Sequence, residues 1–88
     1  MTHTRRAGSA EAQTGRDLGT ELRRRFSLTR SEAIIALLLT DGLSYGEIAE
    51  HLGVSYHTVH THVKAIHEKA RVKSNGRLLA LILGMKEG

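Results

Sequence analysis

The stretch Ser55–Val72 carries the residues best suited to chemistry, because hydrogen-bond donors and a cation recur along it at helical spacing. Val59, Val63, Ile66 and Ala70 are spaced 4, 3 and 4 residues apart, which predicts one buried stripe of an α-helix. A helix that is buried on one side and rich in donors on the other suits the floor of a DNA major groove, although an ordinary solvated face would show the same pattern. The donor-rich side carries Tyr56, His57, His60, Thr61, Lys64 and His67.

The residues just before this helix predict a helix-turn-helix unit. A short helix bearing Ile48 and Ala49 is expected to end at Gly53, because glycine readily takes the left-handed backbone that ends a helix. Val54 should return to the core, and the hydroxyl of Ser55 should cap the next helix. A helix, a short turn with glycine and a second helix are typical of DNA-binding proteins, and a purely structural helical hairpin is the alternative.

Two capping boxes mark the starts of two earlier helices. In Thr29–Glu32 and again in Ser44–Glu47, the hydroxyl can accept the backbone N–H of the third helical residue while the carboxylate accepts the N–H of the capping residue. The first of these helices should end at Gly42 and belong to the core. Its wide apolar face is expected to consist of Ile34, Ile35, Leu38 and Leu39.

A C-terminal helix is expected to follow a cap at Ser74 and to run from Asn75 to about Leu83. It is apolar almost all round, so one face can cover the helix-turn-helix core while the other has no polar residue to solvate it. Complete burial of this helix is the alternative to a subunit contact. We expect the surplus apolar surface to form a dimer interface of Leu78, Leu79, Ile82, Leu83 and Met85.

Length and composition limit the class of protein. The 88 residues allow one small domain, and with 40% hydrophobic but only 3% aromatic residues its core must be mainly aliphatic. The absence of cysteine excludes a disulfide framework and a thiolate metal site. No apolar run approaches the roughly 20 residues of a membrane span, and no signal peptide is visible. We therefore expect a cytoplasmic protein, located at the nucleoid, with no membrane partner.

Positive charge is concentrated at the two ends of the chain. Residues 1–26 carry six arginines against three acidic residues, residues 27–53 have a net charge of −3, and residues 54–88 have a net charge of +4. This distribution favours a polyanionic partner. Residues 1–26 are predicted to be a mobile basic arm with a short extra helix, since Leu18, Leu22 and Phe26 recur every four residues, and residues 27–88 are predicted to be the domain.

Catalytic and metal sites are not expected. Two histidine ligands on one helix usually lie four residues apart, and none of the pairs among His57, His60, His62 and His67 has that spacing. His62 is instead expected at the edge of the core. The serine, threonine and histidine side chains lie on one convex surface, whereas catalysis needs a pocket. We expect no enzyme activity, no cofactor and no small-molecule substrate.

Three runs of residues together resemble the LuxR/GerE-type helix-turn-helix domain over about residues 27–84. The resemblance implies an all-α domain with a tri-helical core and a C-terminal helix, unrelated to winged-helix folds, whose third helix enters the major groove. It also implies a bacterial transcription regulator of double-stranded DNA that acts as a homodimer through the fourth helix. The runs are Leu28-Thr29-x-x-Glu32, Gly42-Leu43-Ser44-x-x-Glu47-Ile48-Ala49 and Leu52-x-Val54-Ser55-x-x-Thr58-Val59-x-x-His62-Val63-x-x-Ile66-x-x-Lys69-x-x-Val72.

Transferred position by position, the resemblance implies which residues contact DNA. Base edges would be contacted by His60, Thr61 and Lys64, and His57 is a further groove donor on the same face. The chain departs from the family pattern at His60, where a basic residue is usual, at Ala70-Arg71, where Leu-Gly is usual, and at Asn75, where arginine is common. Phosphate contacts would come from Ser44, Tyr45, Ser55, Tyr56, Thr58 and Lys69.

Two other functions remain open at this point. The helix-turn-helix could be a scaffold in a protein-interaction module, with the apolar fourth helix docking on RNA polymerase or a receiver domain. A promoter reader similar to sigma-factor region 4 shares the motif. Because the family usually carries a receiver or ligand-binding domain ahead of the DNA-binding module, the chain is expected to be either a stand-alone small regulator or a fragment of a larger one.

Overall fold

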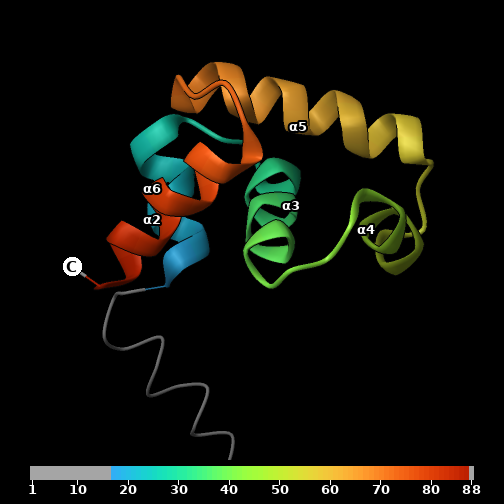
Figure 1. Cartoon of the computed structure of the whole chain (residues 1–88), viewed down its shortest axis with the longest axis horizontal. Helices are drawn as coiled ribbons and strands as arrows, with labels where there is room; N and C mark the ends of the chain where they lie inside the picture. Colours follow the sequence, from blue (N-terminus) through green and yellow to red (C-terminus); the bar gives the residue numbers. More distant parts are fainter. Residues whose placement is uncertain (1–16, 88) are drawn as a thin grey trace, which may run out of the picture.

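The computed structural model describes residues 17–87, which form five α-helices joined by short turns (Figure 1). No strand occurs in this part, which confirms the all-α prediction. The mobile basic arm is predicted over residues 1–26, and its first 16 residues lie outside the described residues. The helices are α2 (Leu18–Phe26), α3 (Arg30–Thr40), α4 (Tyr45–Leu52), α5 (Tyr56–Ala70) and α6 (Asn75–Glu87).

Both predicted capping boxes are confirmed, and they fix where α3 and α4 begin. The N–H of Glu32 donates to Thr29 Oγ1 over 3.1 Å, and the N–H of Thr29 donates to Glu32 Oε1 over 2.9 Å. The same reciprocal pair joins Ser44 and Glu47 at 3.1 and 2.8 Å. Each box satisfies two backbone donors that the first turn of a helix would otherwise leave unpaired.

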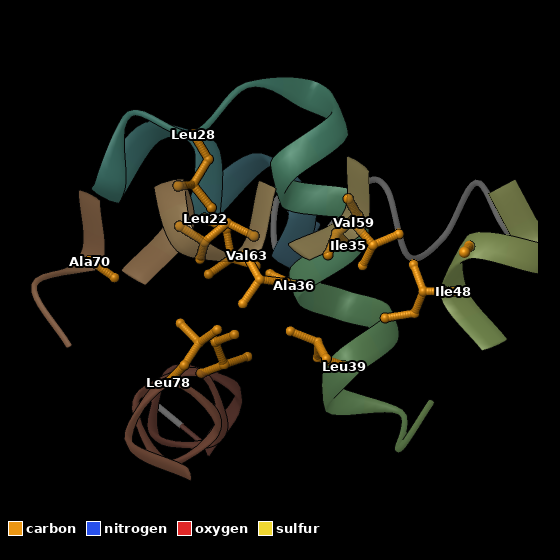
Figure 2. Packing of buried hydrophobic residues seen from close by; sticks show 13 residues of the cluster. Leu22, Leu28, Ile35, Ala36, Leu39, Ile48, Val59, Val63, Ala70 and Leu78 are labelled. Carbon is orange, nitrogen blue, oxygen red and sulfur yellow. The ribbon is translucent and has the colours of Figure 1, made fainter. Parts of the chain in front are cut away.

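One hydrophobic core receives side chains from all five helices (Figure 2). The stripe predicted for α5 is confirmed, because each of its four members is buried. Full burial of one aliphatic side chain stabilises a fold by roughly 1.5–3 kcal/mol, so this stripe fixes which face of α5 is turned inward. The core residues are Leu22, Leu28, Ile35, Ala36, Leu39, Ile48, Ala49, Val59, Val63, Ile66, Ala70, Leu78 and Ile82.

The inward face of α3 differs from the prediction at Ile34. Its side chain is 39% exposed, whereas Ile35 and Leu39 are buried. Successive helical residues are turned by about 100°, so Ile34 lies on the side opposite a buried row with spacing i, i+3, i+4 and i+7. That row is Glu32, Ile35, Ala36 and Leu39, and it includes a carboxylate that apolar patterning could not reveal.

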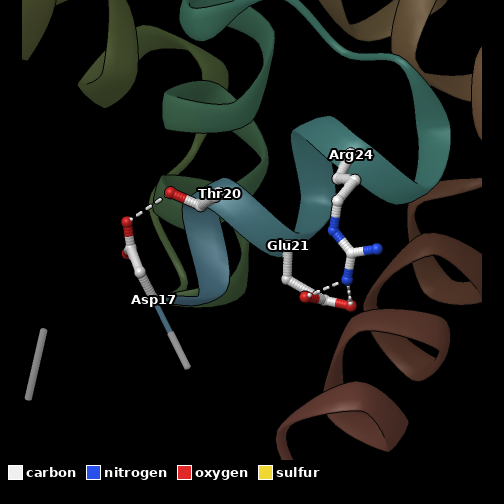
Figure 3. Close-up of polar contacts among 4 residues, drawn as sticks. All are labelled: Asp17, Thr20, Glu21 and Arg24. Atoms are coloured by element: carbon white, nitrogen blue, oxygen red, sulfur yellow. Dashed lines mark hydrogen bonds and ion pairs between the residues drawn. The ribbon is translucent and has the colours of Figure 1, made fainter. Parts of the chain in front are cut away.

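The extra helix predicted near the N-terminus is confirmed as α2, which packs on α3 and α6. Leu22 is fully buried in the core, so the folded unit extends ahead of residue 27. Figure 3 shows two polar contacts between neighbouring turns at the start of α2 and along it. The hydroxyl of Thr20 donates to Asp17 Oδ2 over 2.7 Å, and Arg24 Nη2 lies 2.8 Å from Glu21 Oε1.

The C-terminal helix α6 is capped as predicted, with the N–H of Arg77 donating to Ser74 Oγ over 3.1 Å, but it runs on to Glu87. Leu78 and Ile82 are 1% and 0% exposed within a single chain. These two residues therefore belong to the core and are not available for a subunit contact, which corrects their assignment to the dimer interface. Leu83, by contrast, is 46% exposed.

Candidate nucleic-acid interface

The turn between α4 and α5 is built as the sequence predicts. Gly53 ends α4 with φ 71° and ψ 34°, the left-handed conformation that glycine takes without strain. The N–H of Val54 donates to the carbonyl of Ala49 over 3.0 Å, and the N–H of Thr58 donates to Ser55 Oγ over 3.0 Å. Val54 is 40% exposed, so its predicted return to the core is wrong, because its backbone closes the turn while its side chain stays outside.

One long side of α5 is left uncovered by the other helices. The helices that pack on α5 are α3, α4 and α6, and Figure 1 shows α5 along one edge of the molecule with these three on the same side of it. Tyr56 is 59% exposed. The four residues predicted to read bases are also all exposed on α5, and they are His57, His60, Thr61 and Lys64.

The first turn of α5 gathers groups that can bind phosphate. Ser55 Oγ donates to Thr58 Oγ1 over 2.9 Å while it accepts the N–H of Thr58. Because Thr58 Oγ1 acts as the acceptor, its own proton is available to a further oxygen. A helix N-terminus adds partial positive charge and unpaired N–H groups, and such ends commonly contact DNA phosphates. Ser55, Tyr56 and Thr58, three of the residues predicted to contact phosphate, therefore lie together at this end of α5.

An aromatic cluster joins the start of α4 to the exposed side of α5. The ring centroid of Tyr45 lies 5.8 Å from that of Tyr56 and 6.0 Å from that of His60, and the His60 ring meets it edge-on. Aromatic pairs at these distances are weakly attractive. Tyr45 is half-buried, and the exposed rings of Tyr56 and His60 pack against it.

A hydrogen-bonded network that the sequence did not reveal connects α4, α5 and α6. Asn75 Nδ2 donates to Tyr45 Oη over 3.0 Å, and Asn75 Oδ1 lies 2.8 Å from His67 Nε2. Since an amide oxygen can only accept, this pairing requires the proton on His67 Nε2. His67 is therefore half-buried and engaged with α6, whereas the helical pattern had placed it on the exposed donor face.

Lys69 forms an ion pair with a buried carboxylate on α3. Its Nζ lies 2.7 Å from Glu32 Oε1, and the two side chains are 35% and 7% exposed. Burial raises the pKa of Glu32, but the hydrogen bond from Lys69 and that from the Thr29 N–H outweigh it, so the net shift of the pKa is downward. This geometry gives Lys69 an internal partner and does not support its assignment to DNA phosphate.

Among residues 17–87, no three histidine, cysteine, aspartate or glutamate side chains converge as a metal site would require. None of the described helices has the length and apolar character needed to cross a bilayer.

The helical arrangement agrees with a family comparison. The family described as "Bacterial regulatory proteins, luxR family" (GerE) matches residues 26–81, well over half of the chain. The chain belongs to the LuxR family. This is a family of DNA-binding transcription regulators, and the match runs from the end of α2 into α6, so it includes the whole helix-turn-helix. No curated protein and no solved structure gave a significant match.

Proposed function

We propose that this LuxR-family chain is a sequence-specific regulator of transcription that binds double-stranded DNA with α5 in the major groove. The observation that carries the proposal is the exposed side of α5, which presents donors and a fixed cation while its opposite side is anchored in the core. The major groove admits an α-helix, and the donors and acceptors on its base edges differ for each base pair.

The roles of individual residues follow from their places along α5. Thr61 and Lys64 lie on the open side and would contact base edges, and His57 and His60 would add imidazole donors. The phosphate contacts would come from the groups gathered where α4 and α5 begin, where the aromatic cluster also holds Tyr45 beside the start of α5. They are Ser44, Tyr45, Ser55, Tyr56 and Thr58.

A homodimer formed through the outer side of α6 is the second part of the proposal. Leu83 is nearly half exposed there, and Ala80 and Gly84 beside it are exposed as well. A Cβ built on Gly84 would meet no atom within 4 Å, so the backbone of a second helix could approach closely. Leu79 is half-buried at the margin of this side, whereas Met85, seven residues after Leu78, lies on the core side of α6. Two such open sides would bury each other in a two-fold dimer.

The same exposed side of α6 supports a different function. In a protein-interaction module, this apolar side would dock on a partner such as RNA polymerase, and the polar side of α5 would only be solvated. The two functions respond differently to salt. Phosphate contacts release counterions and weaken steeply between about 50 and 200 mM salt, whereas an apolar contact barely responds.

The test starts from selection of bound duplexes out of a random pool by the full chain. A DNA-reading protein enriches a defined, two-fold-related site and binds it more tightly than random duplex, with a dissociation constant that rises steeply with salt. No enrichment, together with salt-independent capture of RNA polymerase or a receiver domain, would favour the interaction module instead.

A further inference from the structure

Arg71 has an unfavourable backbone conformation at the end of α5. It follows the last helical residue with φ 59° and ψ 43°, in the left-handed region. Glycine usually occupies this position after a helix, because a Cβ there meets the following carbonyl group. In the described residues, Ser27 is the one other non-glycine residue with positive φ, at 59° after α2. An arginine therefore occupies a position whose backbone conformation glycine would adopt with less strain.

The position of Arg71 continues a row of residues on the open side of α5. It comes eleven residues after His60 and seven after Lys64 in the sequence. At about 100° and 1.5 Å per residue, the Cα atom of Arg71, the first after the last helical residue, lies within about 20° of both around the helix axis, and about 16 and 10 Å further along it. The major groove is about 12 Å wide, so a long side chain starting about 10 Å beyond a base-reading lysine could extend past the base edges to the phosphates along the wall of the groove.

Charge at this end of α5 also singles out Arg71. Lys69 is turned about 180° from His60 around the helix and is paired with Glu32. Arg71 is exposed and forms no ion pair with the described side chains, Glu68 included, and Lys73 beside it adds another exposed cation. Arginine suits phosphate, because its planar guanidinium presents several donors at once.

We infer that Arg71 binds a DNA phosphate and holds the C-terminal end of α5 to the groove wall, the part that the family resemblance would give to Lys69. This inference rests on the proposed function and refines it. The DNA interface then has phosphate contacts at both ends of α5, with the base-reading residues between them. A competing explanation is that Arg71 serves only the helix, by placing a cation at its negative end or beside Glu68.

The test is Arg71→Gly in the full chain, measured on a selected duplex and on a random-sequence duplex. We expect the dissociation constant to rise roughly 5- to 10-fold on both, and the slope of log affinity against log salt to become shallower by about 0.9, as for one lost phosphate contact. The Tm should be no lower than that of wild type, because glycine relieves the left-handed conformation. Arg71→Lys should restore most of the affinity.

Ser27→Gly is the matched control, since it makes the same backbone change at the end of α2. It should leave the Tm no lower and the dissociation constant unchanged. Wild-type affinity and slope in Arg71→Gly would overturn the inference, and a lowered Tm in the same variant would identify Arg71 as a helix-end cation. If Lys64→Ala weakens binding while Arg71→Gly does not, the proposed function stands and this inference falls. If wild type binds neither duplex in a salt-dependent way, both fall.

Discussion

The two longest helices, α5 and α6, bury similar aliphatic rows but present opposite surfaces to the outside. α5 anchors Val63 and Ile66 in the core and exposes imidazoles, hydroxyls and Lys64. α6 anchors Ile82 in the same core and exposes Leu83. Burial therefore explains how both helices are positioned, and only their outer sides differ in what they can bind. A donor-rich side suits base edges and phosphates, and an apolar side suits another protein surface.

The largest effect is expected when a substitution on the buried side of α6 is compared with one on its exposed side. Ile82→Ala removes a fully buried side chain and should lower the free energy of unfolding by about 2–5 kcal/mol, whereas Leu83→Ala should change it by less than about 0.5 kcal/mol. Chemical denaturation of each variant measures both values. Sedimentation should show weaker self-association for Leu83→Ala. Equal losses of stability in the two variants would remove the distinction between a core side and an open side.

A smaller effect is expected from the polar side of α5. Lys64→Ala should cost about 1–3 kcal/mol of binding to the selected site and relax the preference at one base pair. The free energy of unfolding should stay near that of wild type, because Lys64 is exposed. Binding to a panel of duplexes that differ at single positions measures the preference. An equal loss on selected and random duplexes would mean that Lys64 contacts only phosphate.

Lys69 lies on the same helix as Lys64 but should affect stability instead of base preference. Lys69→Met leaves the buried carboxylate of Glu32 without its cation and should lower the free energy of unfolding by about 1–2 kcal/mol. The base preference measured on the same panel of duplexes should not change. A changed preference with unaltered stability would place Lys69 in the DNA interface.

The ion pair of Glu32 and Lys69 also predicts that the stability of the fold depends on pH. The pKa of Glu32 in the folded chain lies below its ordinary value of 4.5, so the unfolded chain binds more protons in that range and stability rises with pH. The contribution is fully present above about pH 5 and is lost as pH falls through the lowered pKa. Urea titrations at a series of acidic pH values should show a steeper loss for wild type than for Lys69→Met. Parallel curves would contradict this account of the pair.

The smallest effect concerns the open side of α6. Gly84→Ala should raise the free energy of unfolding of the monomer by about 0.5–1 kcal/mol, because alanine favours a helix interior and its methyl group meets no neighbour in the chain. If two α6 helices approach closely there, the same methyl group should weaken the dimer. Unfolding measured at concentrations low enough for the monomer gives the first effect, and self-association measured at higher concentrations gives the second. A destabilised monomer would show that this side of α6 is covered within the chain.

Local rules predicted much of the fold. The two capping boxes, the left-handed Gly53 and the buried stripe of α5 each depend on a few neighbouring residues, so the sequence could specify them. The exposure of Ile34 and Val54 could not be predicted in the same way. Both are apolar, and which apolar residues are covered depends on how the helices pack. The burial of Leu78 and Ile82 against the other helices has the same cause.

The candidate site was predicted where it depends on one helix and missed where it depends on several. The exposed positions of His57, Thr61 and Lys64 follow from helical periodicity alone. The pairing of Lys69 with Glu32 joins residues 37 positions apart, and the contact of Asn75 with Tyr45 joins residues 30 apart. No local pattern reveals such pairs, although a glutamate in the buried row of α3 could have suggested that it needs a cation.

The measurement that tests the central claim most directly is an NMR titration of the labelled full chain with a selected duplex. If the exposed side of α5 enters the major groove, the largest amide shifts should fall on residues 55–64 and on the start of α4, and they should fade as salt is raised. The largest shifts falling instead on the outer side of α6, with residues 55–64 unchanged, would contradict the account.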